Sequence, residues 1–199
     1  TFSWCLELKR VIFANTVIRI EKFAFYHCEN LVYIRLSITV KNIGQSAFSH
    51  CNLSCIFTPP TCEKIGGSAF AYNRNLSILH VPQDAQLGIC VFAGTRIAKS
   101  SPLHVHVDRN GWYDRTSSPD MNEWIKNMNN NDKFSLHRAC SSFQPLKEDI
   151  HAIIQEKGLI AFREENSAGI TPSQYLKENP NNTLTEKEII REYLMKMMG

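Results

Sequence analysis

The chain has 199 residues, 43% of them hydrophobic and 21% charged, which is the composition of a globular protein with room for one sizeable core or two small ones. Its 22 basic and 19 acidic residues give a net charge of +3, and no run of Lys or Arg exceeds two residues, which argues against a nucleic-acid-binding surface. No apolar run reaches the ~18 residues of a membrane-spanning helix, so neither nucleic acid nor a membrane is an expected partner.

Residues 1–99 repeat a unit of 22 or 23 residues, marked by phenylalanines at positions 2, 25, 48, 70 and 92. An aliphatic residue stands five positions before each phenylalanine from Phe25 on. After its phenylalanine, the third unit is one residue shorter than the others before its leucine position. Because so small a unit encloses almost no interior, successive units must stack to form one continuous core. The recurring positions are Ile20, Ile43, Ile65 and Leu87, then Leu8, Leu31, Leu53 and Leu76, and then Val11, Ile34, Ile56 and Leu79.

Each unit is predicted to contain two short strands and two tight corners. Alternating apolar residues, such as those at 31, 34 and 36 and at 40 and 43, favour strands whose backbones pair with the units above and below. Gly44, Gly66 and Gly88 follow the aliphatic position, and we expect them to supply a positive-φ turn. The Phe-x-x-Cys segment is expected to form a tight turn of short helix on the opposite wall.

The cysteines are seven, an odd number, with no C-x-x-C pair. Cys5, Cys28 and Cys51 recur three residues after the phenylalanine, and Asn73 takes that place in the fourth unit. We interpret the three as a column of small buried thiols, with a soft-metal site or a cross-link as the alternative. Free thiols and the lack of a signal-peptide layout at the N-terminus favour an intracellular location. Three formal sequons, at Asn52, Asn75 and Asn181, leave an exported form open.

The stretch "AFSHCNLSCIFTPPTCEKIGGSAF", residues 47–70, resembles the leucine-rich repeat of the BspA type, whose pattern is roughly A-F-x-x-C-x-x-L-x-x-I-x-L-P-x-x-V-x-x-I-G. Pro59 and Pro82 fall at the proline of that pattern, whereas Ala14 and Ser37 depart from it. The resemblance implies a right-handed, β-rich solenoid of about 4.5 repeats that is used for protein recognition. It carries over no catalytic residue and no cofactor.

The repeat spacing is lost near residues 98–103, and residues 100–133 are predicted to be a linker. This linker contains an alternating, strand-like run, "LHVHVD", at 103–108. It also contains a helix with Ser118 as N-cap and Pro119 in its first turn. Met121, Trp124, Ile125 and Met128 would share the apolar face of that helix.

Residues 134–199 are predicted to be helical. One helix is framed by Pro145 and Gly158, and the last opens with Thr185-x-x-Glu188, a capping box. "FSLHRAC" at 134–140 and "GITPSQYL" at 169–176 resemble the opening of an ankyrin unit, T-P-L-H-x-A. Leucine-rich units followed by an ankyrin-like region resemble large protein families of single-celled algae. The predicted fold class is therefore α+β, a leucine-rich-repeat solenoid followed by a small helical domain.

Two groups of residues could carry chemistry. His104, His106 and Asp108 alternate along a predicted strand and would share one face, as metal ligands or as a solvated polar surface. Cys140 and His137, three residues apart, could pair as a nucleophile and its base, but no orienting group or oxyanion site accompanies them. We therefore expect no metal, cofactor or catalytic residue, and we keep a metal-dependent or thiol enzyme as the alternative.

The leading interpretation is a non-enzymatic interaction or scaffolding protein that displays an extended repeat surface to a protein partner. A third possibility is a subunit packed permanently in a larger assembly, because the chain starts in the middle of the repeat pattern. The variable strand positions are the predicted partner-facing residues. They are Arg19, Tyr33, Arg35, Lys41 and His80.

Overall fold

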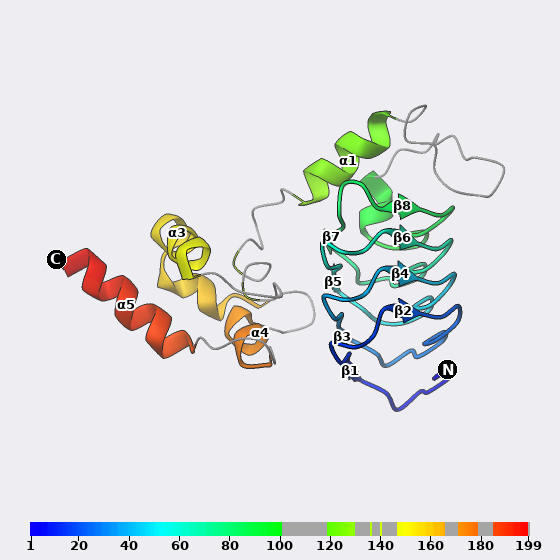
Figure 1. Ribbon diagram of the computed structural model, residues 1–199, viewed down its shortest axis with the longest axis horizontal. Helices are drawn as coiled ribbons and strands as arrows, with labels where there is room; N and C mark the ends of the chain where they lie inside the picture. Colours follow the sequence, from blue (N-terminus) through cyan, green and yellow to red (C-terminus); the bar gives the residue numbers. More distant parts are fainter. Residues whose placement is uncertain are drawn as a thin grey trace. The chain divides into compact units, whose positions relative to one another are not determined.

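The computed structural model describes residues 1–100, 119–129, 136, 140, 147–165, 171–178 and 185–198. It divides into two compact units, Thr1–Asn130 and Asn131–Gly199. The first is a parallel β-solenoid and the second is helical (Figure 1). This confirms the predicted fold class. No helix of the described ranges is long and apolar enough to cross a membrane.

Two strands per repeat form two walls of the solenoid, as predicted, and every pair is parallel (Figure 1). The short-strand wall is one continuous sheet in the order β2-β4-β6-β8, and the long-strand wall consists of two separate pairs, β1-β3 and β5-β7. The short strands are β2 (Arg19–Ile20), β4 (Asn42–Ile43), β6 (Lys64–Ile65) and β8 (Gln86–Leu87). The long strands are β1 (Arg10–Ile12), β3 (Tyr33–Arg35), β5 (Cys55–Phe57) and β7 (Ile78–His80).

The phenylalanines of the repeat form one stacked column along the axis of the solenoid. Neighbouring ring centroids, from Phe2 to Phe92, lie 5.3, 5.2, 5.6 and 6.1 Å apart, and the ring planes differ by no more than 9°. The aliphatic residues of both walls pack around this column, and Ile43 on β4 pairs in register with Ile65 on β6. The core therefore runs continuously through the coils, as the repeat spacing predicts.

The segments around the phenylalanines form the third side of the solenoid, which we call the turn wall. The prediction of a short helix in the Phe-x-x-Cys segment is wrong. Residues two positions before and two positions after each phenylalanine have positive φ, for example 57° at Phe23 and 58° at His50. Their N–H groups bond to carbonyls of the next coil, as in Phe23 N to Gln45 O at 3.0 Å and His50 N to Ala71 O at 3.0 Å. A helix would use these N–H groups internally and leave the coils unlinked.

The corner glycines do not have positive φ, so the prediction that they supply a positive-φ turn is wrong. They are required because adjacent coils approach each other too closely for a side chain. A Cβ added to Gly66 would lie 2.5 Å from Gln45 N, and one on Gly88 would lie 2.3 Å from Gly67 N. Each glycine N–H bonds to the preceding coil, as in Gly66 N to Ile43 O at 2.8 Å. The column of glycines thus sets the spacing of the coils at this corner.

The short third unit explains why Asn73 replaces a cysteine. In the complete units the leucine N–H bonds back within its own coil, as in Leu31 N to Cys28 O at 2.9 Å. In the third unit, one residue short between Cys51 and Leu53, the Leu53 N–H instead donates to Asn73 Oδ1 of the next coil, at 2.9 Å. Asn73 Nδ2 donates to Phe48 O at 2.8 Å. The long-strand wall is interrupted at the same level, between β3 and β5.

Asn73→Ala is expected to lower the free energy of unfolding by about 2–3 kcal/mol, because it leaves the buried Leu53 N–H without its acceptor. Asn73→Cys should lose less, since a thiol can still donate to Phe48 O, as Cys51 Sγ does to Phe25 O at 3.2 Å. Urea denaturation followed by circular dichroism measures both. The exposed Asn75→Ala serves as the control and should cost little, and an Asn73→Cys protein as stable as the wild type would contradict this account.

Helix α1 (Pro119–Asn129) covers one end of the core, as part of the first unit. It contacts β7, and the Trp124 ring lies 5.9 Å from the ring of Phe92, the last of the column. Ile125 is fully buried and Met128 packs against the core. The predicted helix and its apolar face are confirmed for these three residues. A short 3-10 helix, η1 (Ile97–Ser100), precedes the undescribed residues 101–118.

The second unit contains α3 (Lys147–Lys157), η3 (Leu159–Arg163), α4 (Pro172–Glu178) and α5 (Glu186–Met198). Helices α3 and α5 are joined by an ion pair between Lys147 and Glu192 at 2.7 Å, and His151 Nε2 lies 3.1 Å from Ile189 O. The predicted capping box is confirmed, because Glu188 N donates to Thr185 Oγ1 at 3.2 Å and Thr185 N donates to Glu188 Oε2 at 3.0 Å.

Candidate binding surface

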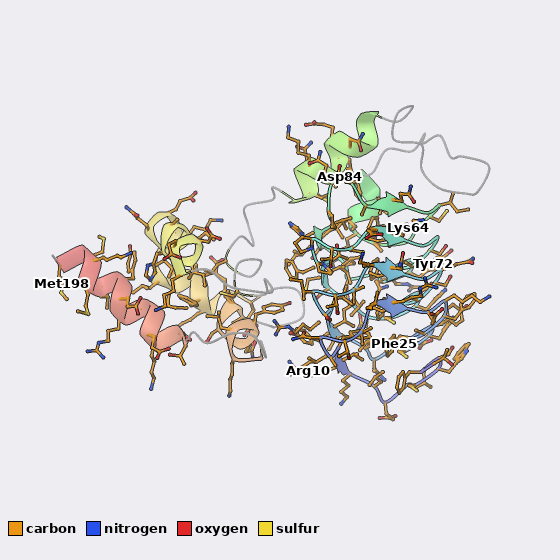
Figure 2. The ribbon with its side chains drawn as sticks, in the orientation of Figure 1. Arg10, Phe25, Lys64, Tyr72, Asp84 and Met198 are labelled. Atoms are coloured by element: carbon orange, nitrogen blue, oxygen red, sulfur yellow. The ribbon has the colours of Figure 1, made fainter. Side chains whose placement is uncertain are left out.

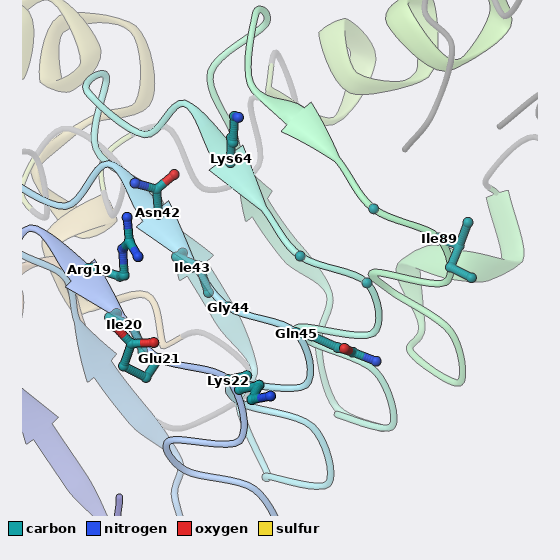
Figure 3. A pocket seen from close by; sticks show the side chains of 13 residues that line it. Arg19, Ile20, Glu21, Lys22, Asn42, Ile43, Gly44, Gln45, Lys64 and Ile89 are labelled. Atoms are coloured by element: carbon teal, nitrogen blue, oxygen red, sulfur yellow. The ribbon is translucent and has the colours of Figure 1, made fainter. Parts of the chain in front are cut away.

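A groove of about 550 Å³ runs across the outside of the short-strand wall at the glycine corner (Figure 3). One rim is formed by the first residues of β2, β4 and β6, and the other rim by residues that follow the glycine position. Between them the floor is mainly backbone, because the glycines have no side chains. The first rim holds Arg19, Asn42 and Lys64, the second Lys22, Gln45 and Ile89, and the floor Gly44, Gly66 and Gly88.

The groove follows directly from the packing of the coils. Any side chain at the floor would collide with the backbone of the preceding coil, so the floor stays open in every coil that has a predecessor at this corner. Glu21 occupies the glycine position in the coil of β2, which is the first strand of this sheet, and it lines the groove at that end. The floor is therefore fixed by the fold, whereas the rims can vary without disturbing the core.

Positive charge predominates along the groove. Arg19, Lys22 and Lys64 line it, against a single carboxylate, Glu21. Within the described ranges, none of these three cations belongs to an ion pair. The neighbouring Glu63 carboxylate is already paired with Lys41 Nζ at 3.0 Å. The groove therefore carries an excess of uncompensated cations.

The predicted partner-facing residues lie on two different walls. Arg19 and Lys41 are exposed on the short-strand wall, and only Arg19 lines the groove. Arg35 and His80 are half-buried on the long-strand wall. That these five residues face a partner stays a prediction, and Tyr33 is buried, with 1% of its surface exposed. The guanidinium of Arg10 lies over its ring, 4.8 Å from the centroid.

A second ring column lies on the outside of the turn wall. Trp4, His27, His50 and Tyr72 stack in sequence with centroids 4.1, 4.1 and 4.4 Å apart. Tyr72 is 49% exposed (Figure 2). Burial, and then the neighbouring His27, lower the pKa of His50 below its ordinary value of 6.5. The stacking of this column was not predicted, although an aromatic residue or His stands two positions after each of the first four phenylalanines.

Two members of the cysteine column donate hydrogen bonds to backbone carbonyls. Cys28 Sγ donates to Phe2 O at 3.0 Å, and Cys51 Sγ donates to Phe25 O at 3.2 Å. Burial raises the pKa of Cys51 and of Cys62 to about 12, so both remain thiols at neutral pH. The interpretation of this column as small buried residues with weak donors is confirmed for Cys28 and Cys51, and Cys5 is half-buried.

The residues singled out for enzyme chemistry are mostly beyond the described ranges. His104, His106, Asp108 and His137 all lie outside them. Cys140 is described and fully buried, and burial raises the pKa of its thiol well above the ordinary value, which opposes a role as a nucleophile. Among the described residues, no group of three His, Cys, Asp or Glu side chains could hold a metal ion.

Comparison with protein families identifies the repeat. A family model described as "BspA type Leucine rich repeat region (6 copies)" matches residues 1–104, which is more than half of the chain. The chain belongs to the BspA-type leucine-rich repeat family. Membership indicates a protein-interaction module and gives no support to an enzyme. The resemblance of residues 134–199 to ankyrin repeats, and of the chain to algal families, stays a prediction.

Among solved structures, a leucine-rich repeat protein from Bacteroides ovatus ATCC 8483 is similar at 24% sequence identity with a TM-score of 0.35. The match covers 45% of this BspA-type chain and 30% of that protein, so the chain spans well under half of the length of the solved relative. No curated protein matches the chain.

Proposed function

We propose that this BspA-type repeat protein is a non-enzymatic interaction module that uses the outside of its short-strand wall to hold a protein partner. The observation that carries the proposal is the uninterrupted four-stranded register of this wall, in which Arg19, Asn42, Lys64 and Gln86 occupy the same position of successive coils. Each strand is joined to its neighbours by backbone hydrogen bonds, so the outward side chains form a rigid row. Preorganised surfaces lose little conformational entropy when a partner binds.

Two further observations support this wall over the long-strand wall. The long-strand wall is split between β3 and β5, whereas the short-strand wall is continuous through all four coils. The outward residues of the short-strand wall are also more exposed, since Arg19, Lys64 and Gln86 are exposed, whereas Tyr33 and Cys55 at the outward positions of β3 and β5 are buried. A scaffolding role for the module follows if the helical unit binds a second protein.

Site-specific photo-crosslinking tests the proposal. A photoreactive amino acid is placed singly at Lys64 and at Gln86 of the full chain, and at Arg74 on the turn wall as the control, and each protein is irradiated in extract from the source cells. We expect Lys64 and Gln86 to give an adduct with the same polypeptide, and Arg74 to give none with it. An adduct that forms only from Arg74 would contradict the proposal, and so would the absence of an adduct from both Lys64 and Gln86.

A further inference from the structure

We propose that the groove on the short-strand wall binds an extended, acidic polypeptide segment, whose carboxylates lie toward Arg19 and Lys22 and whose apolar side chain lies against Ile89. This inference rests on the proposed function and specifies the chemistry of the partner. It draws on the shape of the groove, on its charge and on the chemical difference between its two ends.

The shape of the groove fits a single extended chain. It crosses four coils, from Arg19 on β2 to Ile89 after β8, and neighbouring strands are about 4.8 Å apart, so its length is about 14 Å. At roughly 3.3 Å per residue, four or five residues in extended conformation span that length. The floor lacks side chains at Gly44, Gly66 and Gly88, which lets a main chain lie close to the coils.

The floor does not offer β-strand pairing, so the rims must provide the specificity. The glycine N–H groups already donate to the preceding coil, as in Gly44 N to Ile20 O and Gly88 N to Ile65 O, both at 2.8 Å. A segment running along the solenoid axis also crosses the strands instead of lying parallel to them. Recognition then depends on side chains of the segment that reach Lys64 on one rim and Lys22 on the other.

The charge of the rims selects carboxylates. Three cations face the groove against the one carboxylate of Glu21, and they belong to no ion pair within the described ranges. Two of them, Arg19 and Lys22, belong to the first of the four coils, and Lys64 belongs to the third. Complementary charge raises the rate of association and rejects partners of the wrong sign. An acidic segment therefore fits, and a basic one is repelled.

The far end of the groove is apolar. Ile89 occupies the rim position that Lys22 and Gln45 hold in earlier coils, and its side chain is 45% exposed (Figure 3). A single exposed aliphatic side chain is common on a protein surface, but Ile89 differs from the others in lining the groove. It would bury an apolar side chain of the segment, which makes the site different from a simple anion-binding groove.

Fluorescence anisotropy with labelled eight-residue peptides tests this inference. The probe has three glutamates and one leucine in an alanine background, and its twins carry glutamines or lysines in place of the glutamates. We expect the glutamate peptide to bind with an affinity that falls as salt is raised, the glutamine twin to bind more weakly, and the lysine twin not to bind. A lysine twin that binds as well as the glutamate peptide would overturn the proposal.

Variants locate the binding in the groove. Lys64→Glu and Arg19→Glu should each lower the affinity for the glutamate peptide roughly five- to tenfold, because each removes one attraction and adds one repulsion. Arg74→Glu makes the same change in net charge on the turn wall and should change affinity less than about twofold. Ile89→Gln should lower the affinity for the peptide that contains leucine, but not the affinity for a peptide in which alanine replaces that leucine. Circular dichroism verifies that each variant is folded.

Two results would overturn the inference while leaving the proposed function intact. If Arg74→Glu lowers the affinity for the peptide as much as Lys64→Glu does, the binding reflects overall charge and not the groove. If polyphosphate or a single-stranded oligonucleotide binds as tightly as the peptide and responds to the same variants, the groove is a general anion site. Adducts from Lys64 and Gln86 in the crosslinking experiment would then still support a protein partner on this wall.

Discussion

Gly66→Ala is expected to lower the free energy of unfolding by about 3 kcal/mol or more, although it adds a single methyl group. The added Cβ would lie 2.5 Å from Gln45 N, 2.8 Å from Gly44 C and 2.9 Å from Gln45 Cα. All three are backbone atoms, so the contact cannot be relieved by rotating a side chain. The coils would have to separate, which lengthens the hydrogen bond from Gly66 N to Ile43 O.

Gly67→Ala is the matched control for this prediction, because it is the next residue in the same corner. There the nearest atom to an added Cβ is Ile89 O at 3.2 Å, followed by a side-chain atom of Ile89 at 3.5 Å. A shift of a few tenths of an ångström accommodates such a contact, so the loss should be well under half of that for Gly66→Ala. Urea denaturation followed by circular dichroism compares the two. Equal losses would show that spacing between the coils does not select glycine at this corner.

Phe48→Ala is expected to cost about 3–5 kcal/mol of unfolding free energy, the range for a fully buried phenylalanine. Phe48 has no exposed surface, and its ring stacks between Phe25 at 5.2 Å and Phe70 at 5.6 Å. Phe13 also contacts it edge-on, with centroids 6.3 Å apart. Because the solenoid is stabilised by interfaces between neighbours, a cavity in the middle of the column weakens two interfaces at once.

Phe23→Ala provides the comparison, since Phe23 is 40% exposed on the turn wall and lies outside the column. It should cost about 1 kcal/mol or less, as surface substitutions usually do. Phe48→Leu, which retains most of the buried volume, should fall between the two. Thermal and urea denaturation of the three variants measure the order, and a Phe48→Ala protein that is no less stable than the Phe23→Ala protein would refute the role of the column.

Much of the solenoid could be predicted because its evidence is repeated in the sequence. Each inward position recurs at the same phase, so the pairing of Ile43 with Ile65 and the stacking of Phe48 on Phe70 follow from the spacing alone. The capping box at Thr185 was predictable for a different reason, since its two hydrogen bonds join residues three apart. Local and periodic features of this kind do not depend on the details of packing.

The features that were not predicted depend on contacts between coils. A corner glycine is consistent with positive φ or with close approach of another backbone, and the sequence around Gly66 does not distinguish these two reasons. Positive φ falls instead on residues such as Phe23 and Ser46, which are not typical of that conformation. The groove was likewise unexpected, because only the packing of the coils shows that the two rims, at Lys64 and Gln45, face one another across a bare floor.

The hydrogen bonds between coils run in opposite directions on the turn wall and at the glycine corner. Every N–H of this wall that links two coils donates toward the C-terminal end, from Phe2 to Ala24 O, from Phe25 to Ala47 O and on to Phe70 with Val91 O. At the glycine corner the N–H groups donate the opposite way, toward the N-terminal end, as in Gly66 N to Ile43 O and Gly88 N to Ile65 O, so the peptide dipoles of the two walls oppose each other. Each end of the stack therefore presents N–H groups on one wall and C=O groups on the other, and the pattern at one end is the complement of the pattern at the other.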